Sequence, residues 1–197
     1  MIKINNLTKK YKDKLAVDNL NLEIKTGELF SLLGTNGAGK TTTIKMLSTL
    51  ILPTSGEVEI NNLDLVKDSS KIKEIINISP QETAVASNLT VLENLYFMAG
   101  IYQIPNKEDK IKELIKLFKL EEVLKQKAKT LSGGYQRKLS IAISLINNPK
   151  ILFLDEPTLG LDVISRHDLW KVIEALKGKT IIILTTHYMK EAEVLSD

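Results

Sequence analysis

Short runs of apolar residues alternate along this chain with segments in which apolar residues recur every three or four positions. Three of the runs carry almost no polar residues, as expected for parallel strands covered on both faces: Leu29–Leu33, Ile151–Leu154 and Ile181–Leu184. Four other segments with more polar positions are also predicted to be strands: Ile2–Leu7, Val17–Ile24, Gly56–Ile60 and Ile75–Ser79. The order of elements predicts an α/β fold with a mostly parallel core sheet, and the first two strands predict an antiparallel flank.

The stretch from about Thr90 to Asn148 contains no predicted strand. Thr90 and Glu93 are spaced as a capping box, so we expect a helix to begin there and to continue through Tyr96. Asn106 is expected to cap the next helix. The apolar face of that helix comprises Ile111, Leu114, Ile115 and Phe118. The sequence therefore predicts a helical insert within a parallel-sheet core.

Composition limits the possible classes of function. A length of 197 residues is enough for one domain with a sizeable core. The net charge of only +3 argues against a dedicated nucleic-acid binder. The absence of cysteine excludes disulfides and cysteine-based metal sites and agrees with a cytosolic location. No segment has an apolar signal-peptide core or the ~18 apolar residues of a membrane helix, so we expect a partner to supply any membrane-spanning helices.

The segment GTNGAGKT follows the strand Leu29–Leu33 and matches the P-loop pattern G-x-x-x-x-G-K-[ST] at every fixed position. Its glycines allow backbone N–H groups to point at phosphate oxygens, and the next helix presents its positive end to the same anion. Lys40 would reach the β- and γ-phosphates, Thr41 would offer a hydroxyl to Mg²⁺, and Thr42 would contact the α-phosphate. The residues expected around the nucleotide are Gly34, Thr35, Asn36, Gly37, Ala38, Gly39, Lys40, Thr41 and Thr42.

Two acidic residues, Asp155 and Glu156, follow the buried strand Ile151–Leu154. A carboxylate at the carboxyl end of a central parallel strand lies in the crevice where such sheets bind ligands. We therefore expect Asp155 to hold Mg²⁺, directly or through water, and Glu156 to accept a proton from the attacking water. Adjacent acids are common at strand ends, and the P-loop elsewhere in the chain is what favours the catalytic interpretation.

A second helix start lies in the segment LSGGYQ, and the helix that follows is predicted to be amphipathic, with Leu139, Ile143 and Ile146 on its apolar face. Ser132 suits an N-cap, but the two glycines after it disfavour helix formation and require a reason. One reason is a second anion site, made of the serine hydroxyl and bare backbone N–H groups at a positive helix end. A plain capped turn is the alternative, and this segment taken by itself leaves both interpretations open.

Together, these motifs resemble those of the ATP-binding cassette (ABC) family. LSGGYQ is similar to the family's signature motif, and GTNGAGKT and ILFLDEP resemble its two Walker motifs, in the family's order. Gln81 matches the Q-loop glutamine, Asp162 lies in the segment LGLD that resembles the D-loop, and His187 matches the switch histidine. Tyr11 stands where the family carries an aromatic residue that stacks on adenine. The resemblance extends over essentially the whole chain.

The resemblance implies a P-loop NTPase fold of the ABC ATPase type. Residues 1–197 are expected to form a single ABC ATPase domain, with a helical subdomain at about residues 84–148. Family members continue past the switch histidine with a further strand and helix, so the C-terminal end of the family domain is expected to be missing. Two departures from the family pattern are Thr35, where many relatives have proline, and Tyr135, which precedes Gln136 as in many exporters.

The resemblance also implies that ATP and Mg²⁺ bind between two head-to-tail ABC subunits. The signature of the second subunit would cover the γ-phosphate held by the first, and the residues carried over for this contact and for the D-loop are Ser132, Gly133, Gly134, Gln136 and Asp162. The implied metal ligands are Thr41, Gln81 and Asp155. The implied catalytic residues are Glu156, which activates water, His187, which steadies the γ-phosphate, and Gln81, which joins the metal site to the helical insert.

Further segments, such as LDVISRHDLW and TTHYMKEAE, resemble the subgroup that serves drug, antibiotic and sodium exporters. This resemblance implies an integral membrane permease, bound in a groove beside Gln81 and the Thr90–Ala99 helix. It also implies a cytoplasmic location at the inner face of the cell membrane, and no nucleic-acid partner. The alternative is a non-transport ABC ATPase that acts on a ribosome or nucleic acid. A non-hydrolysing module would require a change at Glu156 or Lys40, and both residues are intact.

Overall fold

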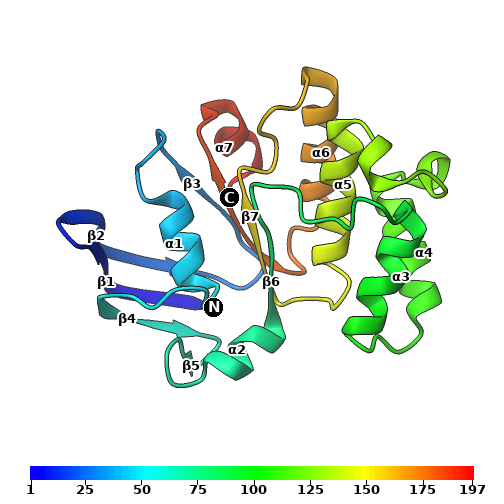
Figure 1. Cartoon of the computed structure of the whole chain (residues 1–197). Coiled ribbons are helices and arrows are strands. Elements are labelled where there is room, and N and C mark those ends of the chain that lie inside the picture. Colours follow the sequence, from blue (N-terminus) through cyan, green and yellow to red (C-terminus); the bar gives the residue numbers. More distant parts are fainter.

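A four-stranded parallel sheet forms the centre of the structure, a computed structural model that describes the whole chain, residues 1–197 (Figure 1). The order of its strands is β3 (Leu29–Leu33), β8 (Ile181–Thr186), β7 (Ile151–Asp155) and β6 (Ile76–Ser79). All four were predicted as strands, and every neighbouring pair is parallel. The prediction of an α/β fold with a parallel core sheet is therefore confirmed.

The side chains of β7 and β8 enter two separate apolar cores, one on each face of the parallel sheet. Leu152, Leu154, Ile182 and Leu184 belong to one core. Ile151, Phe153, Ile181 and Ile183 belong to the other. Because both faces are covered, every residue of these two strands is buried, which explains the uninterrupted apolar runs in the sequence.

A second sheet is antiparallel and contains the two N-terminal strands. It lies at the left of the molecule in Figure 1. The order of its strands is β2 (Lys14–Ile24), β1 (Ile2–Tyr11), β4 (Ser55–Ile60) and β5 (Leu63–Asp64). The predicted antiparallel flank is confirmed, although both N-terminal strands are longer than expected and β5 was not predicted. The helices α1 (Lys40–Leu47) and α2 (Ser69–Ile75) contribute to the core shared by the two sheets.

The helical insert lies at the opposite end of the molecule and contains α3 (Val91–Ile101), α4 (Lys107–Phe118), α5 (Gly133–Ser144) and two short 3₁₀ turns, Glu121–Val123 and Ala128–Thr130. As predicted, it contains no strand, and the capping box at its start is present. The Thr90 hydroxyl accepts the Glu93 N–H at 3.2 Å, and a Glu93 carboxylate oxygen accepts the Thr90 N–H at 2.7 Å. The helix continues beyond Tyr96 to Ile101.

Two local predictions for the insert were wrong. Asn106 does precede α4, but its backbone is left-handed, with a φ of 53°, and its side chain caps no N–H group. Asparagine tolerates this conformation, so the residue turns the chain into the helix instead of capping it. The predicted apolar face of α4 has three buried residues, Ile111, Leu114 and Phe118, whereas Ile115 is half-buried.

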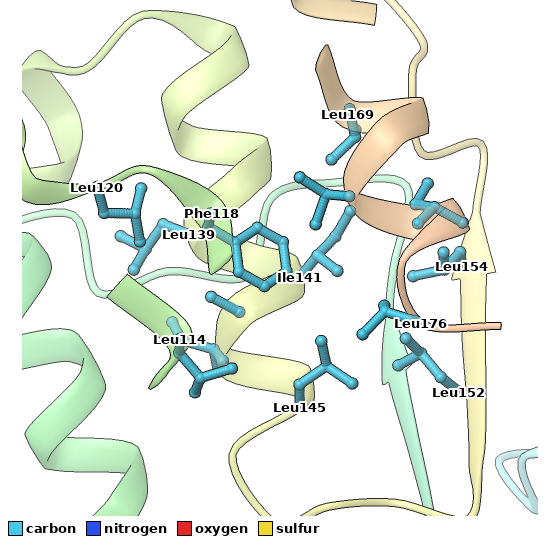
Figure 2. Close-up of a cluster of buried hydrophobic side chains, with 14 of the residues drawn as sticks. Leu114, Phe118, Leu120, Leu139, Ile141, Leu145, Leu152, Leu154, Leu169 and Leu176 are labelled. Atoms are coloured by element: carbon cyan, nitrogen blue, oxygen red, sulfur yellow. The ribbon is translucent and has the colours of Figure 1, made fainter. Parts of the chain in front are cut away.

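The second wrong prediction is that α5 is amphipathic. Every residue from Arg137 to Ser144 is buried, because α5 lies between the parallel sheet on one side and α3 and α4 on the other. Figure 2 shows the resulting core, in which Phe118 of α4, Leu139 and Ile141 of α5 and Leu154 of β7 lie within one cluster. Ile146 is buried but follows the end of the helix.

Two further helices complete the fold: α6 (Val163–Glu174) and α7 (Met189–Leu195). α6 begins after the segment LGLD and packs against α5, and α7 follows β8 and lies against β3. None of the helices combines the length and the apolar character that a membrane crossing requires.

Candidate active site

A cavity of about 470 Å³ opens at the carboxyl ends of the parallel strands. These ends meet because Leu33 of β3 pairs with Thr186 of β8, while Thr185 pairs with Asp155 of β7. Many of the residues singled out from the sequence line this cavity: Tyr11, Asn36, Gly37, Ala38, Gly39, Lys40, Thr41, Thr42, Gln81, Glu156 and His187. Residues from five separate parts of the chain therefore surround one space.

The loop between β3 and α1 depends on glycine. Gly37 and Gly39 have φ values of 86° and 87°, in the left-handed region that side chains disfavour. A Cβ atom on Gly39 would also lie 2.3 Å from the carbonyl oxygen of Ala16, which is too close for any other residue. No side chain caps the start of α1, so its first backbone N–H groups are available to an anion in the cavity.

Lys40 lies folded across this loop and is only 9% exposed. Its ammonium group donates to the carbonyl oxygens of Gly34 at 2.7 Å and Thr35 at 3.1 Å. It also forms an ion pair with a carboxylate oxygen of Glu156 at 3.2 Å. The positive charge of the loop and the candidate general base are therefore in direct contact.

Glu156 uses both of its carboxylate oxygens. One faces Lys40, and the other lies 2.8 Å from Nδ1 of His187. The backbone of Glu156 is left-handed, with a φ of 49°, and its N–H donates to the Thr185 hydroxyl at 2.9 Å. The carboxylate thus lies between a cation and an imidazole at the cavity wall, where it can accept a proton from a water molecule in the cavity.

Asp155 lies beside Glu156 and faces the hydroxyl of Thr41. One Asp155 carboxylate oxygen accepts hydrogen bonds from the hydroxyls of Thr41 at 3.1 Å and Thr185 at 2.6 Å. Oxygens bound to Mg²⁺ at 2.0–2.1 Å in an octahedron lie ~3 Å apart, so the Thr41 and Asp155 oxygens fit two neighbouring positions. No group of three or more acidic, histidine or cysteine side chains could hold a metal by itself, as expected where substrate phosphates supply further ligands.

Gln81 and Tyr11 also form part of the cavity wall. Gln81 is exposed and follows β6, and its backbone carbonyl accepts a hydrogen bond from Arg137 at 3.3 Å. Tyr11 ends β1 and is 46% exposed. The ammonium group of Lys9 lies 5.1 Å from the centre of its ring. An exposed aromatic face at the rim of the cavity is available for stacking with a flat ligand.

Ser132, Gly133, Gly134, Gln136 and Asp162 do not line the cavity. The Ser132 hydroxyl caps α5 by accepting the Tyr135 N–H at 3.4 Å. The Gln136 amide donates to the carbonyl oxygens of Ala128 at 3.1 Å and Leu131 at 3.2 Å, so its side chain supports the preceding turn. Within a single chain, the signature segment and the P-loop are therefore separate helix starts.

Asp162 and Gly134 meet through Ser165 of α6. The hydroxyl and the N–H of Ser165 both donate to the Asp162 carboxylate, at 2.6 and 3.0 Å. These hydrogen bonds hold the pKa of Asp162 below its usual range. A Cβ atom on Gly134 would lie 2.8 Å from the Ser165 hydroxyl. Gly134 is therefore needed for the packing of α5 against α6, a reason that the sequence alone did not reveal.

Two residues that support the site, Arg137 and Thr185, were not among those expected from the sequence. Thr185 holds Asp155 and the backbone of Glu156, as described above. Arg137 is 5% exposed and donates to backbone carbonyls on either side of Glu156. The available signal for Arg137 was its position two residues before the largely apolar run LSIAI.

Comparison with known proteins places the chain in a family. The model of the ABC transporter family matches residues 17–159. Human "Phospholipid-transporting ATPase ABCA3" is 42% identical over 202 residues, covering 100% of this chain and 12% of that protein. "Probable multidrug ABC transporter ATP-binding protein YbhF" of Escherichia coli K12 is 40% identical over 197 residues, covering 98% of this chain and 34% of that protein.

Solved structures give the same result. A dimeric post-hydrolysis state of the ATP-binding cassette MJ0796, bound to ADP and Pi, superposes with a TM-score of 0.86 at 31% identity. That match covers 98% of this chain and 91% of the cassette. The chain spans only a small part of the human relative and about a third of the bacterial one. The chain belongs to the ABC transporter family, and its fold is that of the family's ATPase cassette.

Proposed function

We propose that this chain binds Mg·ATP in the cavity at the end of the parallel sheet and hydrolyses it. The observation that carries the proposal is the position of Glu156, which contacts both Lys40 and His187 at 2.8–3.2 Å. A base, a phosphate-binding cation and a hydrogen-bond donor such as an imidazole are groups that can promote in-line attack of water on a γ-phosphate. The match to the ABC transporter family and the relative named as an ATPase support the same reaction.

Each part of the nucleotide has a proposed site. The segment Gly34–Thr42 surrounds the phosphates with backbone N–H groups and the Lys40 ammonium. Tyr11 stacks on the adenine ring. Thr41 and Asp155, together with Gln81, hold Mg²⁺, which when bound would neutralise charge on the β- and γ-phosphate oxygens. The close approach of the Thr41 and Asp155 oxygens supports this arrangement.

In the proposed mechanism, Glu156 orients a water molecule and accepts its proton while His187 donates a hydrogen bond to the γ-phosphate. Lys40 leaves Glu156 for the phosphate when ATP enters, which frees the carboxylate for the water. Positioning and charge neutralisation then provide most of the rate enhancement. The contact of one Glu156 side chain with both Lys40 and His187 supports this division of roles.

We further propose that two copies, or this chain and a related one, pair head to tail with ATP between them. Ser132, Gly133 and Gly134 of one subunit would then cover the γ-phosphate held by the other. The exposure of Ser132 and Gly133, outside the chain's own cavity, supports this arrangement. The related cassette MJ0796, which is dimeric in its ADP- and Pi-bound state, supports it as well. Asp162, which caps the neighbouring helix, would contact the other subunit through the D-loop.

The partner that uses the energy of hydrolysis is proposed to be an integral membrane permease. We propose that it binds in a groove beside Gln81 and α3. Several aromatic and aliphatic side chains of α3 and the residue after it are exposed: Tyr96, Phe97, Ile101 and Tyr102. This surface would place the chain at the inner, cytoplasmic face of the cell membrane. Relatives named for phospholipid and multidrug transport support an exporter of lipid-like, drug-like, antibiotic or ion cargo. Residues 1–197 would act as one ATPase domain, with residues at about 84–148 as its helical subdomain.

The experiment that tests the reaction measures phosphate release by the purified chain with and without Mg²⁺, over a range of ATP concentrations. Saturable release that requires Mg²⁺ supports the proposal, and binding of ATP without release contradicts it. The partner is tested by solubilising membranes that contain the tagged chain and identifying what co-purifies. An integral membrane protein supports the transporter, whereas co-sedimentation with ribosomes or DNA supports the alternative of a non-transport ATPase.

A further inference from the structure

Arg137 joins two turns that lie far apart in the sequence. Its Nε donates to the carbonyl oxygen of Pro157 at 2.8 Å, and its Nη2 donates to that of Asp155 at 2.7 Å. Its Nη1 donates to the carbonyl oxygens of Pro80 at 2.5 Å and Gln81 at 3.3 Å. One side chain of α5 therefore binds both the turn after β6 and the turn after β7.

The guanidinium of Arg137 keeps its charge despite its burial. Loss of solvation lowers its pKa to about 10, while the carboxylates of Asp155, Glu191 and Glu156 act in the opposite direction. A pKa of about 10 leaves the group positively charged at neutral pH. Its direct partners are four backbone carbonyl oxygens. The planar fork of an arginine suits this set, because its N–H groups point in fixed, divergent directions.

The backbone held by Arg137 includes the one strained residue of the active site. Glu156 lies between Asp155 and Pro157, and its φ of 49° is unfavourable for a residue with a side chain. Such a conformation costs about 1–3 kcal/mol and persists only where contacts with the surrounding structure hold the backbone in place. Arg137 fixes the carbonyl groups of Asp155 and Pro157, and the Thr185 hydroxyl fixes the N–H of Glu156. The direction of the Glu156 side chain therefore depends on Arg137.

From these contacts we infer that Arg137 is a positioning residue for ATP hydrolysis. It fixes the orientation of the Glu156 carboxylate and the position of the turn that contains Gln81. Both residues can then contact the same bound nucleotide. Since Arg137 lies on the helix that Ser132 begins, it also joins the signature segment to the catalytic carboxylate through one rigid element. This inference rests on the proposed ATPase function and adds to it a residue that does not touch the nucleotide.

The test compares Arg137→Gln and Arg137→Lys with the control Lys138→Gln. Lys138 is the next residue of α5 and is also buried, but its charged group lies 3.8 Å from Asp168, away from the catalytic turns. The measurements are kcat, KM for ATP, affinity for a fluorescent ATP analogue, and the melting temperature. Misplacement of a catalytic group by about 1 Å costs about 100-fold in rate, and we expect a loss of kcat of this size in Arg137→Gln.

The affinity for the ATP analogue and the KM are expected to change little in both Arg137 variants, because the nucleotide-binding loop is not altered. Arg137→Lys keeps the charge but lacks the fork, so we expect kcat between those of Arg137→Gln and the native chain. Lys138→Gln is expected to match the native kcat. A third variant, Arg137→Ala, serves for rescue: added guanidinium ions are expected to restore part of its kcat, and ammonium ions at the same concentration are not.

A native kcat in both Arg137→Gln and Arg137→Lys would overturn the inference. It would also fall if the rate loss merely followed a loss of nucleotide affinity and of melting temperature, which is the signature of a structural role. If Arg137→Gln does not fold, Arg137→Lys decides, and a native kcat in that variant rejects the inference. A native chain that does not hydrolyse ATP would instead contradict the proposed function, so the two failures are distinguishable.

Discussion

The ammonium group of Lys40 lies 3.2 Å from a carboxylate oxygen of Glu156, so the P-loop and the end of β7 are joined by an ion pair. Both side chains are largely shielded from water, with exposures of 9% and 7%. A phosphate group that enters the cavity competes with Glu156 for Lys40. In the proposed mechanism, the binding of nucleotide would therefore release the Glu156 carboxylate from Lys40.

Replacement of Lys40 by alanine is expected to abolish hydrolysis. The loss of a charged hydrogen-bond donor is worth about 1.5–3 kcal/mol, which corresponds to a decrease in ATP affinity of about 10- to 100-fold. Phosphate release and titration with a fluorescent ATP analogue measure the two effects. Lys45→Ala is the matched control, since Lys45 is an exposed lysine of the same helix. An unchanged ATPase rate in Lys40→Ala would refute the assignment of the P-loop.

Replacement of Glu156 by glutamine is expected to trap ATP and to stabilise a dimer. Glutamine keeps the shape of the side chain but accepts no proton, and it removes a negative charge next to the γ-phosphate. Light scattering on a size-exclusion column, with saturating Mg·ATP, measures the mass of the complex. The controls are the native protein and the double variant that carries both Lys40→Ala and Glu156→Gln. A variant that stays monomeric under these conditions would count against a site shared by two subunits.

The two signature glycines are expected to respond differently to alanine. A Cβ atom on Gly134 meets Ser165 at 2.8 Å, so Gly134→Ala should destabilise the fold by about 1–3 kcal/mol. A Cβ atom on Gly133 meets only Leu161, at 3.9 Å, so Gly133→Ala should keep the native melting temperature. In the Glu156→Gln background, however, we expect Gly133→Ala to weaken the ATP-dependent dimer. If Glu156→Gln forms the same amount of dimer whether or not it also carries Gly133→Ala, then Gly133 does not face the nucleotide.

Tyr11 is expected to contribute to nucleotide affinity through its ring. Stacking of an aromatic ring is worth about 0.5–1.5 kcal/mol beyond the area that it buries, so Tyr11→Ala should raise the KM for ATP by up to about tenfold. Tyr11→Phe, which keeps the ring, should retain the native KM. The KM for GTP in the same two variants tests whether Tyr11 contacts the nucleotide base. A native KM in Tyr11→Ala would remove Tyr11 from the site.

The capping box at the start of α3 predicts a dependence of stability on pH. The hydrogen bond from the Thr90 N–H, followed by that from its hydroxyl, lowers the pKa of Glu93 from 4.5. A lowered carboxylate pKa stabilises the fold above the unfolded value, and the effect is lost as pH falls through the folded value. Glu93→Gln, which mimics the protonated side chain, should therefore lower the melting temperature at pH 7, and its melting temperature should approach that of the native chain under acid conditions. A constant difference at all pH values would contradict this account.

Residues whose role depends on their own neighbours in the chain could be predicted from the sequence. The P-loop, the Thr90 cap and the apolar strands β7 and β8 follow from local chemistry and periodicity. The full burial of α5 could not be predicted, because it depends on α3, α4 and the sheet meeting around one helix. The role of Arg137 was hidden for a similar reason, since its partners are backbone carbonyls that carry no sequence signal. Gly134 suited an anion site by residue type, whereas its contact with Ser165 arises only in the folded chain.

The apolar cluster in Figure 2 extends without interruption from α4 through α5 to β7. A rotation of the insert away from the sheet would create a cavity beside these strands. Each Å³ of cavity volume would destabilise the fold by about 24 cal/mol. Repositioning of α3 and α4 is therefore limited to a sliding of packed side chains over one another. A force applied by a partner at α3 would then reach the strand ends as a shear motion. The insert would slide along the sheet while staying packed against it, and it would not rotate away as a hinged unit.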